Sequence, residues 1–251
     1  MQIVGIQNNS FVDYPGKIAM VLFAFGCNMN CYYCHNRNII GGRPPKVVYA
    51  PEFILNELEK KKDFLDAVVI TGGEPTLNDD LPEFIAKIKE KNLLVKLDTN
   101  GTNPKMLKEL IKKNLVDYIA MDIKTTKEKY HEYYSSVGAR LGAPVIAREA
   151  KQSSGFLNNI EQSILLIKNS NIPHEFRTTF DPTLTKEDII EIAKWLAEDD
   201  IPQKYTIQQF RNPQNKYIDK RLALPPHPKE YLEQTLKSVA KIIPSATLRG
   251  I

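Results

Sequence analysis

The chain has 251 residues, enough for one large domain or two small ones. Hydrophobic residues make up 42% and charged residues 25%, and a dispersed net charge of +4 does not predict a nucleic-acid partner. The chain shows neither a signal-peptide pattern nor an apolar run of membrane-spanning length, so we expect a cytoplasmic protein with reduced thiols and no membrane partner.

Short apolar runs alternate with longer amphipathic runs from one end of the chain to the other. This alternation predicts a parallel sheet of right-handed crossover units, and six strands in one run predict an α/β fold, a partial (β/α)6 barrel, in a single domain over residues 1–251. The predicted strands lie at 18–25, 67–71, 93–98, 116–123, 174–180 and 204–210. The predicted helices lie at 51–62, 81–91, 104–113, 127–134, 157–169, 186–198 and 229–243.

One segment does not fit this alternation. Residues 138–155, GARLGAPVIAREAKQSSG, have no sustained period and are rich in Gly, Ala and Ser. We expect an inserted surface loop, which a fold tolerates because each doubling of loop length costs only about 0.6 kcal/mol. The alternative is that VIAREAK within it forms a helical turn on the surface.

Each predicted strand ends in polar or chemically reactive residues. In parallel α/β barrels the site lies at the carboxyl ends of the strands, so these six endings are expected to converge on one place. They are FGC at 25–27, TGGEP at 71–75, DTNG at 98–101, MDIK at 121–124, FRTTF at 176–180 and QQFRN at 208–212.

All three cysteines of the chain, Cys27, Cys31 and Cys34, lie within eight residues, spaced C-x3-C-x2-C. Three thiols in a polar stretch are a poor way to build a core, and a zinc ion would have to take the adjacent Cys34 and His35 as ligands. Covalent haem at CYYCH is normally assembled outside the cytoplasm. The remaining interpretation is an iron–sulfur cluster held by three thiolates, which leaves one iron of a 4Fe–4S cube open.

With Tyr33 before the last cysteine and GGEP downstream, the cysteine pattern resembles that of the radical S-adenosylmethionine (radical SAM) superfamily. More narrowly, FVDYPGKIAMVLFAFGCNMNCYYCHNR resembles the N-terminal signature of glycyl-radical-enzyme activating proteins. Within these it is most similar to the activating protein of the anaerobic ribonucleoside-triphosphate reductase in its longer form. The resemblance runs from residue 10 to about residue 210 and skips 138–155.

The resemblance implies a 4Fe–4S cluster on the three cysteines, with S-adenosylmethionine (SAM) on the open iron and a 5′-deoxyadenosyl radical as its product. It also implies which residues surround SAM: Tyr33, Gly72, Gly73, Glu74, Pro75, Asn100, Lys124 and Arg177. Because no further cysteine remains for a second cluster, the electron is expected from an external flavodoxin or ferredoxin.

Asp98 and Asp122 end two neighbouring predicted strands, where their carboxylates would repel each other unless a cation lay between them. In activating enzymes of this type, the equivalent pair together with Thr99 holds a monovalent cation beside SAM. A further acid, Asp13 in VDYPG, resembles a position that faces the glycyl-radical partner. A plain turn aspartate is the alternative, and both interpretations stay open.

Three functions are compared on these residues. The first is an activator that installs a glycyl radical on a partner enzyme, anaerobic ribonucleotide reductase in particular. The second is a radical SAM enzyme of the deazaguanine-forming type that acts on a small molecule. The third is a noncatalytic electron-transfer or metal-binding protein, which would not need GGEP, DTNG and MDIK at its strand ends. The FVDYPG block and the incomplete barrel favour the activator.

Overall fold

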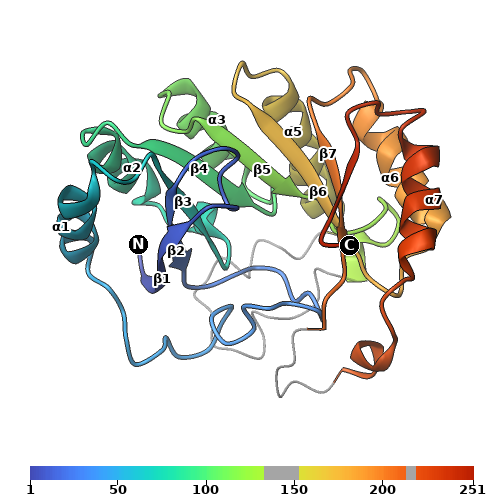
Figure 1. The fold of residues 1–251 in the computed structure, drawn as a ribbon, viewed down its shortest axis with the longest axis horizontal. Coiled ribbons are helices and arrows are strands. Elements are labelled where there is room, and N and C mark those ends of the chain that lie inside the picture. The colour runs from blue at the N-terminus through green and yellow to red at the C-terminus, as the bar shows by residue number, and fades with distance from the viewer. Residues whose placement is uncertain (133–152, 213–218) are drawn as a thin grey trace.

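The computed structural model describes residues 1–132, 153–212 and 219–251. Within these residues, one sheet holds all the named strands side by side in chain order (Figure 1). The first strand pairs antiparallel with the second, and every later pairing is parallel. The strands are β1 Ile3–Ser10, β2 Ala19–Ala24, β3 Ala67–Gly72, β4 Leu94–Thr99, β5 Tyr118–Asp122, β6 His174–Phe180, β7 Tyr205–Gln209 and β8 Thr247–Arg249.

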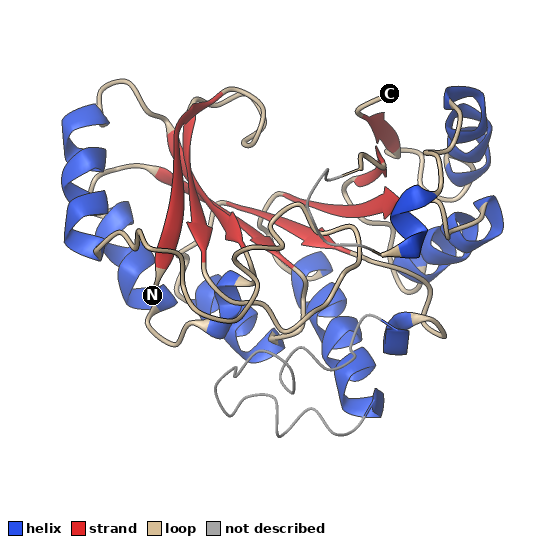
Figure 2. Ribbon diagram, turned by 90° about the horizontal axis from the view of Figure 1, so that it is seen from below, coloured by secondary structure: helices blue, strands red, loops and turns tan. Residues whose placement is uncertain are grey.

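The sheet curves into an open arc, and the helices lie on its outer side (Figure 2). Because β1 and β8 are the two ends of the strand order and do not pair with each other, the barrel is incomplete. The helices are α1 Pro51–Lys61, α2 Leu81–Lys89, α3 Pro104–Lys112, α5 Ser153–Lys168, α6 Lys186–Ala197 and α7 Lys229–Val239. Short 3-10 turns lie at η1 Pro75–Leu77, η2 Tyr130–Glu132 and η4 Lys220–Ala223.

Local sequence fixes where several helices start. Thr185 and Asp188 form a capping box at α6, in which the Thr185 hydroxyl accepts from the Asp188 amide at 3.2 Å and the Asp188 carboxylate accepts from the Thr185 amide at 2.8 Å. At α3 the Asn103 side-chain oxygen accepts from the Met106 amide and so caps the helix. Pro104 follows at the first helical position, where a missing amide hydrogen costs nothing.

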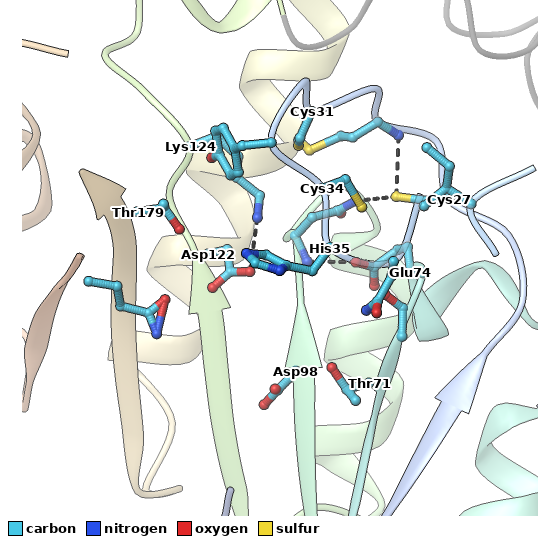
Figure 3. Close-up of a pocket in the computed structure, with 18 of the residues that line it drawn as sticks. Cys27, Cys31, Cys34, His35, Thr71, Glu74, Asp98, Asp122, Lys124 and Thr179 are labelled. Atoms are coloured by element: carbon cyan, nitrogen blue, oxygen red, sulfur yellow. Dashed lines mark hydrogen bonds and ion pairs between the residues drawn. The ribbon is translucent and has the colours of Figure 1, made fainter. Parts of the chain in front are cut away.

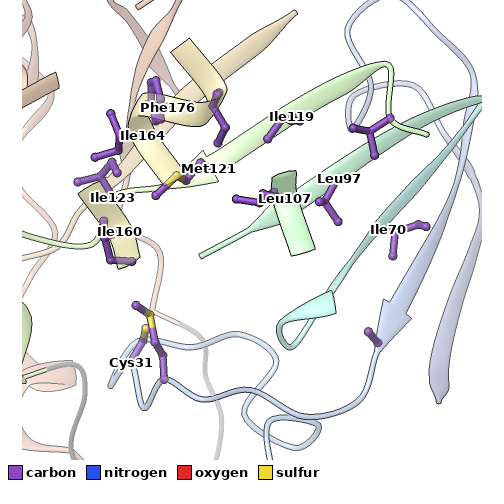
Figure 4. Close-up of a cluster of buried hydrophobic side chains, with 14 of the residues drawn as sticks. Cys31, Ile70, Leu97, Leu107, Ile119, Met121, Ile123, Ile160, Ile164 and Phe176 are labelled. Carbon is purple, nitrogen blue, oxygen red and sulfur yellow. The ribbon is translucent and has the colours of Figure 1, made fainter. Parts of the chain in front are cut away.

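The core lies between the outer face of the sheet and the helices (Figure 4). Strand residues that point outward are apolar, and they meet apolar side chains of α3 and α5. Figure 4 labels Cys31 and nine apolar members of this core that are almost fully buried: Ile70, Leu97, Leu107, Ile119, Met121, Ile123, Ile160, Ile164 and Phe176. This continuous apolar layer is what fixes the strands in register and therefore the positions of their ends.

The inner face of the arc carries alternate residues of the same strands, because successive side chains of a strand point to opposite faces. At the amino ends of the strands this face is apolar: Tyr14, Ala19, Val21, Ala67 and Val69 form a small cluster of their own. Towards the carboxyl ends it becomes charged, with ion pairs that join β4 to β6 and β6 to β8. The charged end of the inner face is where the predicted site residues are found.

The six predicted parallel strands are confirmed as β2 to β7, with bounds that differ by no more than a few residues. The sequence analysis missed both end strands. Strand β1 has exposed and half-buried residues over most of its length, so no strict apolar alternation marks it. Strand β8 has only three residues, which is too short for any period to show.

Two further expectations need correction. The helix predicted at 127–134 is, in its described part, the 3-10 turn η2, because the hydrogen bonds there join residues three apart, such as Lys129 N to the Thr126 oxygen. The predicted loop 138–155 overlaps helix α5, which begins at Ser153, so the loop interpretation is wrong for its last three residues. Residues 138–152 lie outside the described residues.

Replacing residues 138–152 with a short Gly/Ser linker is expected to preserve folding, because no motif that matches the radical SAM pattern falls there. The helix from Ser153 onward has to be kept, since Ile160 and Ile164 of α5 are core residues. Circular dichroism and a thermal unfolding curve would check this, and a large loss of unfolding temperature would show that the segment packs against the core.

Among the described residues, no helix is both long enough and apolar enough to cross a membrane.

Candidate active site

A pocket of about 430 Å³ lies at the carboxyl ends of the strands, on the inner face of the arc (Figure 3). Its wall includes residues from each of the strands β3 to β8 and from the segments that follow β2 and β4. The predicted site residues among its lining are Cys27, Cys31, Tyr33, Cys34, Gly72, Gly73, Glu74, Asp98, Thr99, Asn100, Asp122 and Lys124. The expectation that the strand endings converge is therefore met by the geometry.

The three thiols share this pocket, and none of them forms a disulfide. Burial raises the pKa of the Cys27 thiol well above its usual range, and the neighbouring Cys31 raises it further. Burial also raises the pKa of Cys31 to about 11, and a thiolate at Cys34 would add to that shift. Burial raises the pKa of the Cys34 thiol too. Three thiols that resist ionisation fit a strongly cationic group, which would take them as thiolates and release their protons.

A single metal ion fits these cysteines poorly. Among the described residues, no three His, Cys, Asp or Glu side chains are gathered closely enough to hold one ion. The structure therefore gives no support to a zinc site built from the cysteines and His35. Three separate thiols around one cavity suit a group with several metal atoms, in which each thiolate binds a different one.

The loop that carries the cysteines contacts the segment after β6 and the turn η4. The Tyr32 hydroxyl donates to the buried Asp181 carboxylate, just beyond β6, at 2.6 Å. The Arg221 guanidinium of η4 lies over the Tyr32 ring, 4.1 Å from its centre. Arg37 donates to the Cys31 carbonyl at 3.1 Å. The Tyr32 contacts place the cysteines relative to segments that are far away in sequence, and the Arg37 contact supports the loop from within.

The double glycine after β3 is required by close backbone packing. Gly72 has a φ of +111°, and a Cβ there would lie 2.5 Å from the Ala24 amide nitrogen. A Cβ on Gly73 would collide with the Gly26 carbonyl, and the next amide, Glu74 N, donates to that same oxygen at 2.7 Å. The glycines therefore seat the GGEP segment directly against the chain that leads into Cys27, a structural role that the sequence analysis did not assign.

Glu74 is 1% exposed, and its carboxylate joins two loops. It accepts from the Thr76 hydroxyl at 2.6 Å, the Thr99 hydroxyl at 2.7 Å and the Asn100 amide at 2.6 Å. Burial raises the pKa of Glu74, and these hydrogen bonds offset only part of that effect. The Glu74 side chain thus joins the GGEP segment to the DTNG segment, and both of its carboxylate oxygens accept hydrogen bonds from within the protein.

Asn100 connects the DTNG segment to the cysteine loop. Its side-chain amide donates to Cys27 Sγ at 3.8 Å and to Asn28 Oδ1 at 2.9 Å. The Asn28 amide in turn donates to the Thr102 hydroxyl at 2.8 Å. This chain of amides fixes the Cys27 thiol and supplies a hydrogen-bond donor to its sulfur, which is one way in which proteins tune a metal thiolate.

Asp98 and Asp122 lie on neighbouring strands, and the chain itself supplies their counter-charges. Arg177 donates to Asp122 Oδ1 at 2.8 Å and to Asp98 Oδ2 at 3.3 Å, so its guanidinium bridges the two carboxylates. Lys96 lies 2.6 Å from Asp98 and Lys124 lies 2.9 Å from Asp122. These five residues are called the Arg177 network below.

The network keeps both acids ionised. Burial alone would raise the pKa of Asp98, but Arg177 and Lys96 outweigh it and hold that pKa below its usual range. The pKa of Asp122 is lowered in the same way, because Arg177 and Lys124 outweigh its burial. The repulsion that the sequence analysis used to infer a metal cation is thus already relieved by a guanidinium.

Some predicted site residues do not reach the pocket wall. Pro75 begins the buried turn η1, and Arg177 acts from behind Asp98 and Asp122. Asp13 lies in the turn after β1, at the opposite end of β2 from Cys27, and accepts from the Ser10 hydroxyl at 2.5 Å. This geometry is that of a turn aspartate.

The sequence analysis also missed part of the wall. Thr179, Arg249 and Gly250 line it together with Gln208 and Arg211. Gln208 and Arg211 belong to the QQFRN strand ending and Thr179 to FRTTF, and all three were noted without a role. No local signal marks Arg249, because it lies on the three-residue strand β8.

The fold and this pocket define a class of protein, and sequence comparison agrees with it. A model of the radical SAM superfamily matches residues 21–196, which is more than half of the chain. The chain therefore belongs to the radical SAM superfamily. Within it, the chain is a member of the glycyl-radical-enzyme activating enzymes, as the relatives below show.

One relative, from Methanocaldococcus jannaschii, bears the name of a candidate glycyl-radical enzyme activating enzyme. It is 39% identical over 251 residues, which cover 99% of this chain and 96% of the relative. The pyruvate formate-lyase-activating enzyme of Clostridium pasteurianum is 28% identical over 205 residues, 76% of this chain and 74% of that protein.

Among solved structures, Streptococcus suis SuiB bound to S-adenosylmethionine aligns with a TM-score of 0.62 at 14% identity. The alignment covers 92% of this chain and 50% of SuiB, so this chain spans half the length of that protein. At this identity the likeness concerns the fold alone.

Proposed function

We propose that this enzyme generates a glycyl radical on a partner protein, and that its three cysteines hold a 4Fe–4S cluster beside a SAM site. The observation that carries the proposal is one pocket that joins all three thiols to the GGE and DTN segments and to Asp122 and Lys124. The family supports the cofactors, and its activating members support the reaction.

When bound, the cluster and SAM supply the reductive cleavage of a carbon–sulfur bond that yields a 5′-deoxyadenosyl radical. The chain's own residues bind and orient. Cys27, Cys31 and Cys34 offer three ligands from one loop, and Lys124 offers a cation to a carboxylate. Tyr33 is 5% exposed and packs edge-on against Phe210, which helps to close the site to water.

The SAM residues are proposed in two groups. Gly72, Gly73 and Asn100 line the pocket directly, so backbone and amide groups there can meet the methionine end of SAM. The second group supports the first. Glu74 holds the GGEP segment against DTNG, Pro75 begins the turn η1 that follows, and Arg177 pairs with Asp98 and Asp122.

We also propose that a monovalent cation binds at Asp98, Thr99 and Asp122 when SAM is bound. Arg177 bridges the two carboxylates in this structure, so an added cation has to share them with the guanidinium. The SAM carboxylate would bring the additional negative charge that such a cation needs.

The partner we propose is an anaerobic ribonucleoside-triphosphate reductase, on the strength of the FVDYPG block near the first strand. A flavodoxin or ferredoxin in the cytoplasm would donate the electron, because the chain has no cysteines for a second cluster. Asp13 remains a proposed contact for the partner; its distance from the pocket means that it would touch the partner away from the reacting glycine.

The test is anaerobic incubation of the reconstituted enzyme with SAM, reduced flavodoxin and an anaerobic ribonucleoside-triphosphate reductase. Electron paramagnetic resonance is expected to show a glycyl radical on the reductase, and a reductase whose radical glycine is replaced by alanine serves as the control. Absence of that signal with every glycyl-radical enzyme tried, together with turnover of a small molecule, would favour the deazaguanine-forming alternative.

A further inference from the structure

The wall of the pocket formed by β7 and β8 has no part in the cluster or SAM assignments. Gln208 on β7 lies directly opposite Arg249 on β8 in the parallel register. The Thr206 and Thr247 hydroxyls, two residues earlier on each strand, lie 3.4 Å apart, so these alternate residues share the inner face. Both Gln208 and Arg249 line the pocket.

Arg249 forms an ion pair with the buried carboxylate of Glu175. Its Nη2 donates to both oxygens of Glu175, at 2.9 and 3.3 Å, and Glu175 is 1% exposed. The Arg249 side chain is 42% exposed, and within the described part of the chain its hydrogen bonds all come from Nη2. The ion pair therefore holds the guanidinium through Nη2, while Nε and Nη1 form no hydrogen bond with a described residue.

Arg211 brings a second guanidinium to the same place. A Cβ on Gly250 would lie 3.5 Å from Arg211 Nη2, so the guanidinium lies beside the residue that follows Arg249. The side chain is exposed, lines the pocket, and forms no hydrogen bond or ion pair with any described residue. The carboxylates of the Arg177 network already have their own cations, so Arg211 carries the unpaired charge on this wall.

We infer that Arg211 and Arg249 form a carboxylate subsite for an acidic side chain of the partner's glycine-bearing peptide. The inference rests on the proposed function. A guanidinium binds a carboxylate through two parallel charge-assisted hydrogen bonds, and two guanidiniums at one site make the preference for an anion stronger. Arg211 follows β7 and is exposed, and β8 beside it is the last strand of the sheet among the described residues. An anion bound there can therefore belong to a chain that continues outside.

Labelled peptides with a central glycine provide the test. One glutamate is moved through the three positions on either side of the glycine, and each peptide is matched by its glutamine counterpart. Fluorescence anisotropy with the reconstituted enzyme and SAM is expected to show, for at least one position, about tenfold tighter binding of the glutamate peptide. Arg211→Gln, which breaks no ion pair, is expected to bring that ratio close to one.

The control variant is Arg43→Gln, an exposed arginine outside the pocket lining, which is expected to keep the wild-type ratio. A second variant, Arg249→Lys, keeps a cation next to Glu175 and is expected to reduce the ratio partly. Equal affinity for every glutamate and glutamine pair, including no measurable binding of either, would overturn the subsite. So would an unchanged ratio in Arg211→Gln.

Two further results separate this inference from the proposed function. If glutarate alone binds as tightly as the best glutamate peptide and Arg211→Gln abolishes that binding, the subsite serves a small molecule and the peptide assignment is wrong. If the glutamate preference holds while no glycyl-radical enzyme receives a radical, the subsite stands and the proposed function fails.

Discussion

Cys31→Ser is expected to leave the protein folded and to abolish SAM cleavage. Cys31 is 8% exposed and lines the pocket with the other two thiols, so a serine fits its space closely. A serine hydroxyl does not provide the thiolate that an iron–sulfur cluster requires. The measurements are iron content and visible absorbance after reconstitution, and release of 5′-deoxyadenosine under reducing conditions. All three are expected to fall to background.

The matched control is Asn38→Ser, an exposed position on the same loop that does not line the pocket. It is expected to retain both the cluster and SAM cleavage. Far-ultraviolet circular dichroism of Cys31→Ser has to match that of the wild type for the comparison to hold. Full SAM cleavage by Cys31→Ser would show that the cluster assignment is wrong.

Asp98→Ala is expected to lower the free energy of unfolding by about 3–5 kcal/mol, because it leaves a buried cation without its partner. Lys96 is 2% exposed, and its ammonium lies 2.6 Å from the Asp98 carboxylate. Arg177 loses one of its two carboxylates in the same variant but keeps Asp122. Urea unfolding of the cluster-free protein, followed by circular dichroism, measures the effect.

Glu109→Ala provides the control, since Glu109 and Lys113 form a pair of similar length, 2.7 Å, on the surface. Breaking that pair is expected to cost only about 0.2–1 kcal/mol. Adding Lys96→Met to Asp98→Ala removes the unpaired cation and is expected to recover most of the lost stability. A loss in Asp98→Ala no larger than that of the control would contradict the buried-pair explanation.

The double variant, Asp98→Ala with Lys96→Met, also tests whether Asp98 belongs to the SAM site. Because its stability is expected to be close to that of the wild type, a change in SAM affinity would not reflect unfolding. Its affinity for SAM is expected to be weaker than that of the wild type, and the dependence of that affinity on potassium is expected to shrink if Asp98 shares a cation with SAM. Unchanged SAM affinity would show that Asp98 has no role in SAM binding and serves only to stabilise the Arg177 network.

Sequence reasoning predicted β2 to β7 because their apolar runs are continuous and each is followed by an amphipathic helix. It predicted most of the pocket for the same reason: parallel strands end at one edge, so motifs that follow strands meet there. It misjudged the segment near residue 130, where the buried Tyr130 ring packs against Trp195 and Phe156 and fixes a turn that local propensity did not reveal.

The cysteine cluster was determined by the sequence alone, since its members lie within one short loop and covalent proximity keeps them together. Only the tertiary structure decided which charge lies next to which. Glu175 and Arg249 are 74 residues apart, and Asp98 and Arg177 are 79 apart. A strand's period shows which residues share a face, but strand neighbours and curvature determine which side chains meet across it. For that reason the Arg177 network and the guanidinium pair of Arg211 and Arg249 emerged only from the folded chain.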